Sequence, residues 1–202
     1  IQYAPELLTY IKVRVDQKHE NGSYFLTGSQ MFHLMHEVSE SLAGRVGILS
    51  MYSMSRAEIE GYDSVPFLPD APVCRAPEAT ITDIFQKIYR GGMPAMVVDK
   101  EILPEDYFGS YMQTYLERDI RDLVRVKDEN KFLKFISCVA ARTSQEVNLS
   151  DLAKDVMIDQ KTAEQWLSIL VSSGLVYLLH PYSGNTIKRI VKRPKLYFMD
   201  TG

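Results

Sequence analysis

The chain has 202 residues, of which 46% are hydrophobic and 24% charged, with a formal net charge of -3. These values are typical of a globular protein and exclude a generally basic surface, so any cationic surface must be local. No apolar run approaches the roughly 18 residues that a membrane span needs. Cys74 and Cys138 match no metal or redox spacing. We therefore expect a cytoplasmic protein with reduced thiols and no membrane partner.

Residues 1–62 predict the order helix, strand, helix, strand. Apolar residues at helical spacing follow one another through residues 6–17. Residues 24–27 and 46–51 are typical of buried strands, and between them lies a second helix that Gly44 is expected to end. This order with short connections indicates a parallel α/β sheet.

Proline-rich sequence interrupts this pattern between residues 63 and 80, which predicts a connector and a domain boundary. Beyond it the sequence predicts a helix that begins at Thr82-Asp83 and stops at Gly91, Gly92 and Pro94. A long helix over 106–124 and another over 130–143 follow. These breaks divide the chain into residues 1–62, 63–80, 81–142 and 143–202.

The last sixty residues predict two short helices joined by a tight turn and followed by a β-hairpin. Ser150 and Asp151 open the first helix, and Asp159 is placed to cap the second. The second helix is expected to bury the apolar side chains of Ala163, Trp166, Leu167 and Leu170. Two strands then flank a turn at 183–185. This is the order of a winged helix, whose second helix can enter a major groove of DNA.

Cations gather on the predicted hairpin of this otherwise acidic chain. They are Lys188, Arg189, Lys192, Arg193 and Lys195. Such clustering suits phosphate neutralisation, but cations also protect a solvated edge hairpin against strand pairing. On the second helix Lys161 and Gln165 could reach bases, although Glu164 lies beside them and no arginine is placed to contact guanine. Double-stranded DNA and a protein partner both stay open, with the protein partner slightly favoured.

Two further patterns are weak evidence for a metal site or a phosphate-binding loop. His33 and His36, each with a glutamate four residues on, have a spacing that can hold a metal, but a third ligand is missing and ordinary i,i+4 pairs explain them. Gly91-Gly92 follows a helix rather than a strand, so we expect a structural turn and not a phosphate loop. By itself the chain is not expected to be a catalyst.

Three residues in the segment 1–62 could take part in ATP hydrolysis, namely Thr27, Ser29 and Arg45. A polar residue at a strand end can hold the attacking water or touch the γ-phosphate, and an arginine further along can neutralise the developing charge. Ser29 as a helix cap and Arg45 as a surface ion-pair partner explain the same residues equally well. Spacing does not decide between these roles.

Six stretches in one order carry a resemblance to a known family. They are IQYAPELLTYIK, YFLTGSQ, SESLAGRVGILSMYSMSRAEI, YRGGMPAMV, YLERDIRDLV and KRPKLYFMDTG. The chain resembles AAA-type P-loop ATPases of bacteria and archaea that carry a C-terminal domain of unknown function numbered 4143. The resemblance covers nearly the whole chain. It implies a partial parallel-sheet P-loop ATPase core, a helical lid-like region and a winged-helix-like module.

In that family the acidic pair and the glycine-lysine phosphate loop precede the stretch that begins at Ile1. The resemblance therefore implies a piece of a longer protein that binds ATP and magnesium, with negligible ATPase activity in this piece. By position, Ser29 would be a sensor-like residue and Arg45 an arginine finger or γ-phosphate sensor, with Thr27 and Ser29 near the nucleotide. We expect no nuclease activity within these residues.

Overall fold

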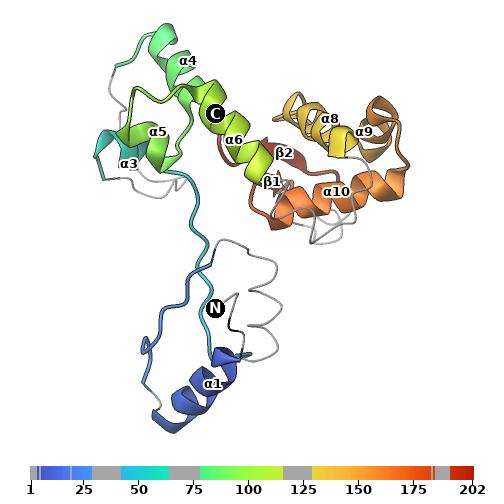
Figure 1. Cartoon of the computed structure of the whole chain (residues 1–202). Helices are drawn as coiled ribbons and strands as arrows, with labels where there is room; N and C mark the ends of the chain where they lie inside the picture. Colours follow the sequence, from blue (N-terminus) through green and yellow to red (C-terminus); the bar gives the residue numbers. More distant parts are fainter. Residues whose placement is uncertain are drawn as a thin grey trace.

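The computed structural model describes residues 4, 6–18, 20–28, 42–63, 78–115, 129–182, 184 and 192–202. Within them the protein is mixed α–β and mostly helical, with a small sheet of two antiparallel strands. Figure 1 shows a lower part that holds the N-terminal helix, an upper part of short helices, and a helical body that contains the sheet. None of the helices described is long and apolar enough to cross a membrane.

The lower part is built on α1 (Leu7–Lys18), which confirms the first predicted helix. Leu8 of α1 is buried against Leu42, and Ile11 and Leu26 pack on this pair. The second predicted helix lies outside the described residues. Gly44 has a φ of 75° in the turn that follows Leu42, a conformation that glycine adopts without steric cost.

The parallel sheet expected in this part is not formed by the described residues. Residues 24–27 and 46–51 are extended but belong to no strand. A strand is stable only where neighbours satisfy its backbone and cover its side chains. Here Phe25, Leu49 and Met51 are each at least 90% exposed. The prediction of buried strands was therefore wrong for these segments as the structure has them.

Two short helices of the upper part escaped the sequence prediction. The first is α3 (Arg56–Glu60), which Ser55 and Glu58 cap reciprocally and Gly61 ends in a left-handed conformation. The second is α5 (Pro94–Val98). We expected Pro94 to stop a helix, whereas it occupies the first turn of a new one, where its missing N–H costs nothing.

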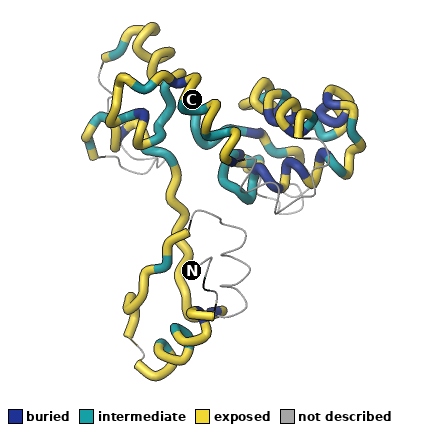
Figure 2. Tube along the Cα trace, in the orientation of Figure 1, coloured by how far each residue is buried: buried dark blue, intermediate teal, exposed yellow. Residues whose placement is uncertain are grey.

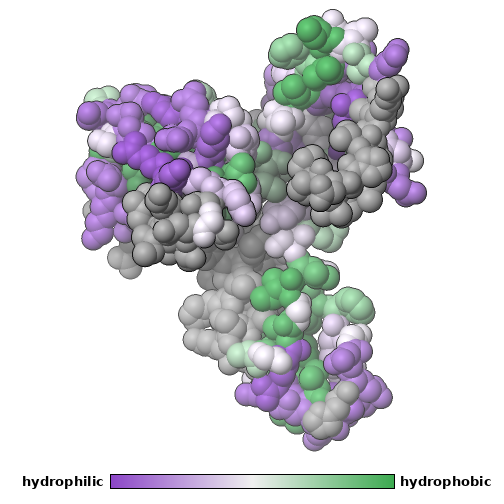
Figure 3. Space-filling view, turned by 180° about the vertical axis from the view of Figure 1, so that it is seen from behind, coloured by the Kyte–Doolittle hydropathy of each residue, from purple (hydrophilic) through white to green (hydrophobic). Residues whose placement is uncertain are grey.

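Between them lies α4 (Ile81–Arg90), a predicted helix that Thr80 caps together with Asp83. Its sequence is strongly amphipathic, yet none of its residues is buried. Apolar surface gathers over this helix at the top right of Figure 3. Arg90 ties its end to α5, because the guanidinium Nη2 donates to the carbonyls of Met96 (2.9 Å) and Asp99 (3.0 Å).

The predicted long helix begins two residues earlier than expected, as α6 (Pro104–Tyr115). Its predicted continuation to residue 124 lies outside the described residues. The Tyr115 side chain is buried, and its hydroxyl donates to Ser173 Oγ at 2.7 Å. Through this contact α6 joins the upper part to the helical body (Figure 1).

The helical body holds most of the buried residues, as Figure 2 shows. Its helices are α8 (Glu129–Ala140), α9 (Leu149–Val156) and α10 (Gln160–Ser172). Phe132 and Phe135 of α8 pack edge-on against Trp166 of α10, with ring centroids 5.2 and 5.5 Å apart. Asp159 caps α10 as predicted, and all four residues expected in its buried face are buried.

The hairpin strands are β1 (Val176–Leu179) and β2 (Lys195–Phe198), which pair antiparallel. The predicted turn between them lies largely outside the described residues. On its other edge β2 bonds the segment that precedes α9, since Ser144 N donates to Leu196 O (2.7 Å) and Leu196 N to Gln145 O (3.0 Å). Thus β2 lies in the middle, between β1 and residues 144–147.

Candidate functional site

Arg45 follows the turn at Gly44 and reaches back to the first helix. Its Nε and Nη2 donate to the two carboxylate oxygens of Asp16 at 2.5 and 3.1 Å, and Nη1 donates to the carbonyl of Ala43 at 3.1 Å. The hydrogen bond to Asp16, with its negative charge, raises the pKa of Arg45 above its ordinary value. The guanidinium is a fixed, solvent-accessible cation on the outside of the lower part.

The two other candidate nucleotide contacts are not joined to Arg45 by any contact that the structure describes. Thr27 is exposed in the extended segment after α1, and Ser29 lies outside the described residues. Arg45 at present engages a carboxylate of its own chain. Arg45 thus forms a surface ion pair, which is one of the two roles that the sequence left open.

The candidate nucleic-acid contacts fall on two neighbouring elements of the body. Lys161 and Gln165 are exposed on α10, and Lys192 and Arg193 are exposed just before β2. The two remaining candidates of the hairpin, Lys188 and Arg189, lie outside the described residues. Glu146 lies opposite the neighbouring Lys195 in an isolated antiparallel β-bridge between their backbones.

One arrangement of polar groups was not predicted and joins three distant stretches of chain. Met54 N donates to the carbonyl of Gly92 at 2.7 Å, and Gly92 N donates to Asp200 Oδ2 at 2.9 Å. Beside them Ser53 Oγ donates to the carbonyl of Met199 at 3.3 Å. We call the contacts among Met54, Gly92 and Asp200 the joint. Figure 1 places the C-terminus beside α5 and α6, where these stretches meet.

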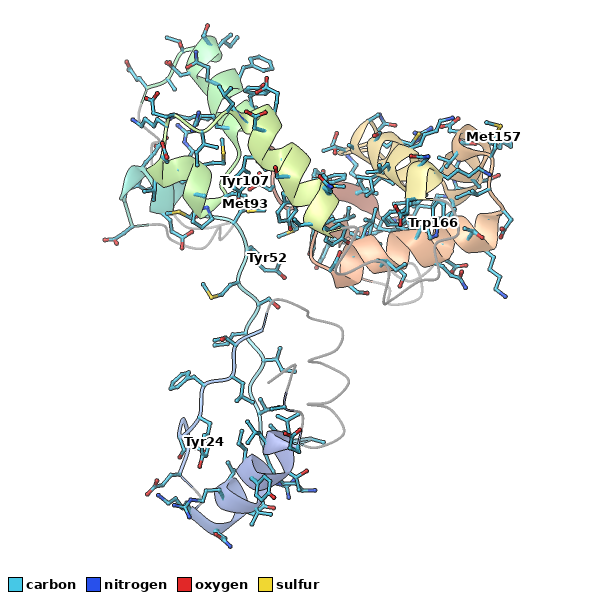
Figure 4. All side chains as sticks on the ribbon, viewed as in Figure 1. Tyr24, Tyr52, Met93, Tyr107, Met157 and Trp166 are labelled. Carbon is cyan, nitrogen blue, oxygen red and sulfur yellow. The ribbon has the colours of Figure 1, made fainter. Side chains whose placement is uncertain are left out.

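Glycine is required in the joint because the backbones approach too closely for a side chain. A Cβ at Gly92 would overlap the carbonyl oxygen of Met54, and a Cβ at Gly91 would overlap the carboxylate of Asp200. In the view of Figure 4, Met93 and Tyr107 lie above Tyr52, which belongs to the segment that leads up from the lower part. The glycine pair, which the sequence predicted to be a turn, is therefore also the place that the segments of Met54 and Asp200 both contact.

The described residues contain no cluster of metal-binding side chains. No group of three or more histidine, cysteine, aspartate or glutamate side chains among them could hold a metal ion. The paired histidines of the sequence, His33 and His36, lie outside the described residues.

Comparisons with known proteins divide the chain in two. Residues 81–202 match the family described as "Domain of unknown function (DUF8612)", and residues 1–60 match an AAA domain. The AAA part of the resemblance is thus supported, whereas the C-terminal domain numbered 4143 is not confirmed. No solved structure gives a significant match.

Two curated relatives come from mycobacteria. They are Uncharacterized protein Mb2031c of Mycobacterium bovis and Uncharacterized protein Rv2008c of Mycobacterium tuberculosis, each 27% identical over 205 residues. The alignment covers 100% of this chain and 41% of each relative, so the chain spans less than half their length. Because the match to residues 81–202 takes in more than half of the chain, the protein belongs to the DUF8612 family, and its first sixty residues are similar to an AAA domain.

Proposed function

We propose that this chain is part of an AAA-type protein that hydrolyses ATP, with residues 1–60 on the sensor side of the nucleotide site. The observation that carries the proposal is the match of residues 1–60 to an AAA domain. The exposed guanidinium of Arg45 is consistent with it, because a cation that meets a phosphate must be accessible.

Arg45 acts, in this proposal, as the residue that senses the γ-phosphate, and Ser29 as the polar residue beside it. Bound to Asp16, the guanidinium is held through two donors in the geometry that also suits a phosphate. Exchange of the Asp16 carboxylate for a phosphate oxygen would bring Arg45 into the site. Within this proposal, the magnesium ligands and the phosphate cradle are supplied by residues other than those that the structure describes.

The test is ATP turnover in the full natural protein that carries this sequence. We expect Arg45→Ala to lower kcat by about 10³-fold or more, as for arginines that stabilise phosphoryl transfer. The matched control is Arg56→Ala, since Arg56 is also exposed and also paired, with Glu60. Its turnover should equal that of the wild type.

Equal turnover in the Arg45 and Arg56 variants would remove Arg45 from the site. Absence of turnover in the wild-type natural protein, assayed free of contaminating ATPases, would overturn the ATPase function itself. The 202-residue chain alone is expected to be inactive, and activity in it that Arg45→Ala abolishes would contradict the proposed division of residues.

A second candidate function is binding of double-stranded DNA by the helical body, as a winged helix. The observation that favours it is the element order: α8, the short segment at 144–147, α9, α10, β1 and β2, with β2 in the middle. A winged helix presents its second helix and its hairpin to DNA. Lys161, Lys192 and Arg193 lie on those two elements and are exposed.

Duplex binding measured as a function of salt tests this second candidate. Replacing Lys188, Arg189, Lys192 and Arg193 together by alanine should abolish binding, because these side chains neutralise phosphates. The control replaces exposed Arg14, Lys18, Lys134 and Lys154, which lie on other elements. If duplex binding is absent, or does not weaken with salt, DNA binding is excluded. The helical body is then expected to bind a protein partner.

A cytoplasmic location completes the proposal. It follows from the chemistry of the two cysteines, which lack a disulfide or metal spacing and suit a reducing compartment. Growth of the source cells with a fluorescent fusion of the natural protein would check it by microscopy.

A further inference from the structure

We propose that the joint of Met54, Gly92 and Asp200 transmits displacement between the segment that follows Arg45 and the sheet of the C-terminal body. The three residues belong to the AAA-like part, the α4–α5 turn and the segment after β2. Their hydrogen bonds measure 2.7 and 2.9 Å, and Gly92 takes part in both, with its carbonyl and with its N–H. Residue 92 thus connects the other two directly.

The AAA-like side of the joint is an extended segment. Residues 46–55 run upward from the turn at Arg45 without a strand partner among the residues described (Figure 1). Met54 lies nine residues after Arg45, and nine residues reach at most about 30 Å. A displacement of the lower part beyond this reach is therefore passed to Met54, because the segment cannot lengthen further.

The C-terminal side of the joint is connected to the body within a few residues. Asp200 follows β2, whose strand lies in the middle of the sheet. Just before it, Met199 N donates to the carbonyl of Leu175 at 2.9 Å, beside the end of α10. The carboxylate of Asp200 is itself fixed, since Gly92 N and Gly202 N each donate to one of its oxygens at 2.9 Å. A movement of Gly92 is thus passed to β2 through the Asp200 side chain, which these two hydrogen bonds fix in place.

The groups of the joint lie in direct contact with one another. The overlaps that a Cβ would create at Gly91 and Gly92 show that the backbone of Met54 and the carboxylate of Asp200 lie directly against the turn. Groups in direct contact pass on a displacement toward one another because they cannot overlap. The joint therefore has the two properties that a coupling contact needs, a continuous chain of bonds and direct contact between its members.

The first experiment uses this chain without nucleotide and measures hydrogen–deuterium exchange of three peptides, residues 46–55, 91–99 and 195–202. Gly92→Ala and Asp200→Ala should each raise exchange about tenfold or more in peptides 91–99 and 195–202 and at the Met54 amide of peptide 46–55, because loss of the joint releases both sides. The matched controls are Gly109→Ala, where a Cβ meets nothing within 4 Å, and the exposed Asp106→Ala. Fluorescence of the single tryptophan, Trp166, reports that the body stays folded.

A change confined to the mutated peptide would overturn the proposal, since the two sides would then be independent. Asp200→Ala removes both carboxylate oxygens and adds no bulk. It therefore breaks the bond to Gly92 even where Gly92→Ala fails to fold.

The second experiment rests on the proposed function and uses the full natural protein with ADP and with a non-hydrolysable ATP analogue. The wild type should show a nucleotide-dependent difference in the exchange of residues 195–202, and Asp200→Ala should lose it while turnover stays the same. Persistence of the difference in Asp200→Ala would overturn the joint as the route. If the wild type binds no nucleotide, the proposed function fails, and the first experiment alone decides the joint.

Discussion

At the scale of single residues, polar side chains in the described chain act chiefly on the ends of helices. Ser55, Thr80, Asn148 and Asp159 each accept a hydrogen bond from a backbone N–H of the helix that they precede. The first N–H groups of a helix have no partner within it, so such caps satisfy groups that water would otherwise have to solvate. Three of these four caps have an acid three residues on that accepts in return or stands in the first turn.

The cap formed by Asp159 makes the stability of the fold depend on pH. Thr162 donates to its carboxylate from both its hydroxyl (2.6 Å) and its backbone N–H (2.9 Å), which lowers the pKa of Asp159 below its ordinary value of 3.8. A lowered folded-state pKa means that the ionised carboxylate stabilises the fold above its ordinary pKa. That stabilisation is lost as the pH falls through the folded-state pKa.

We therefore expect Asp159→Ala to lower the Tm at neutral pH, and its deficit relative to the wild type to shrink as the pH falls below 3.8. Thermal unfolding followed by circular dichroism at several pH values measures this. Asp159→Asn is the control, because asparagine caps helices about as well but does not ionise. A deficit of Asp159→Ala that stays constant with pH would contradict the role of the charge.

At the scale of elements, the turn between α9 and α10 contains a residue with an unusual backbone. Met157 ends α9 with φ 56° and ψ 54°, the left-handed conformation that glycine prefers and that costs other residues about 1 kcal/mol. Its side chain is 73% exposed, so little burial compensates for this cost. The helix–turn–helix of the body thus carries a local strain at its turn.

Met157→Gly is expected to raise the free energy of unfolding by about 0.5–1 kcal/mol, because glycine removes the clash of the Cβ. Denaturant unfolding followed by Trp166 fluorescence gives the value. Met157→Ala separates the backbone effect from loss of the long side chain, since alanine keeps the Cβ and hence the strain. A glycine variant no more stable than the alanine variant would show that Met157 is not strained.

At the scale of the whole molecule, burial is concentrated in one region. Among the described residues, the larger buried cluster spans α6, α8, α9, α10 and the hairpin, whereas the lower part buries Leu8 and Leu42. Between the lower part and the rest runs the extended segment of residues 46–55, with Leu49 and Met51 almost fully exposed. Exposed, unpaired backbone is where proteases cut first.

Limited chymotrypsin digestion of this chain should therefore cleave at Leu49, Met51 or Tyr52 before any site within 129–182. Mass spectrometry of the early products would identify the cut. A Leu49, Met51 and Tyr52 triple serine variant should delay this product, while the corresponding change at exposed Leu179 of β1 should not. Early cleavage inside α8 or α10 at a comparable rate would contradict the division into a weakly and a strongly packed part.

Local sequence signals predicted the elements whose causes are local. The capping aspartate and the apolar spacing of α10 are read within a few residues, and both were confirmed in the structure. The reciprocal cap at Ser55 and Glu58 shows that α3 was also readable, although its short length hid it. Pro94 was misjudged because a proline excludes a helix interior but favours a first turn, and the choice depends on where the preceding helix ends.

The sequence by itself determined the helices and hairpin of the C-terminal body and the resemblance of residues 1–60 to an AAA domain. Only the tertiary structure decided that residues 24–27 and 46–51 stay extended without forming strands, because a strand depends on partners that spacing along the chain does not reveal. It also decided the pairing of Arg45 with Asp16 and the bond from Gly92 to Asp200, which lie 29 and 108 positions apart. Contacts at such separations follow from how the packed parts meet, and no short stretch of sequence contains that information.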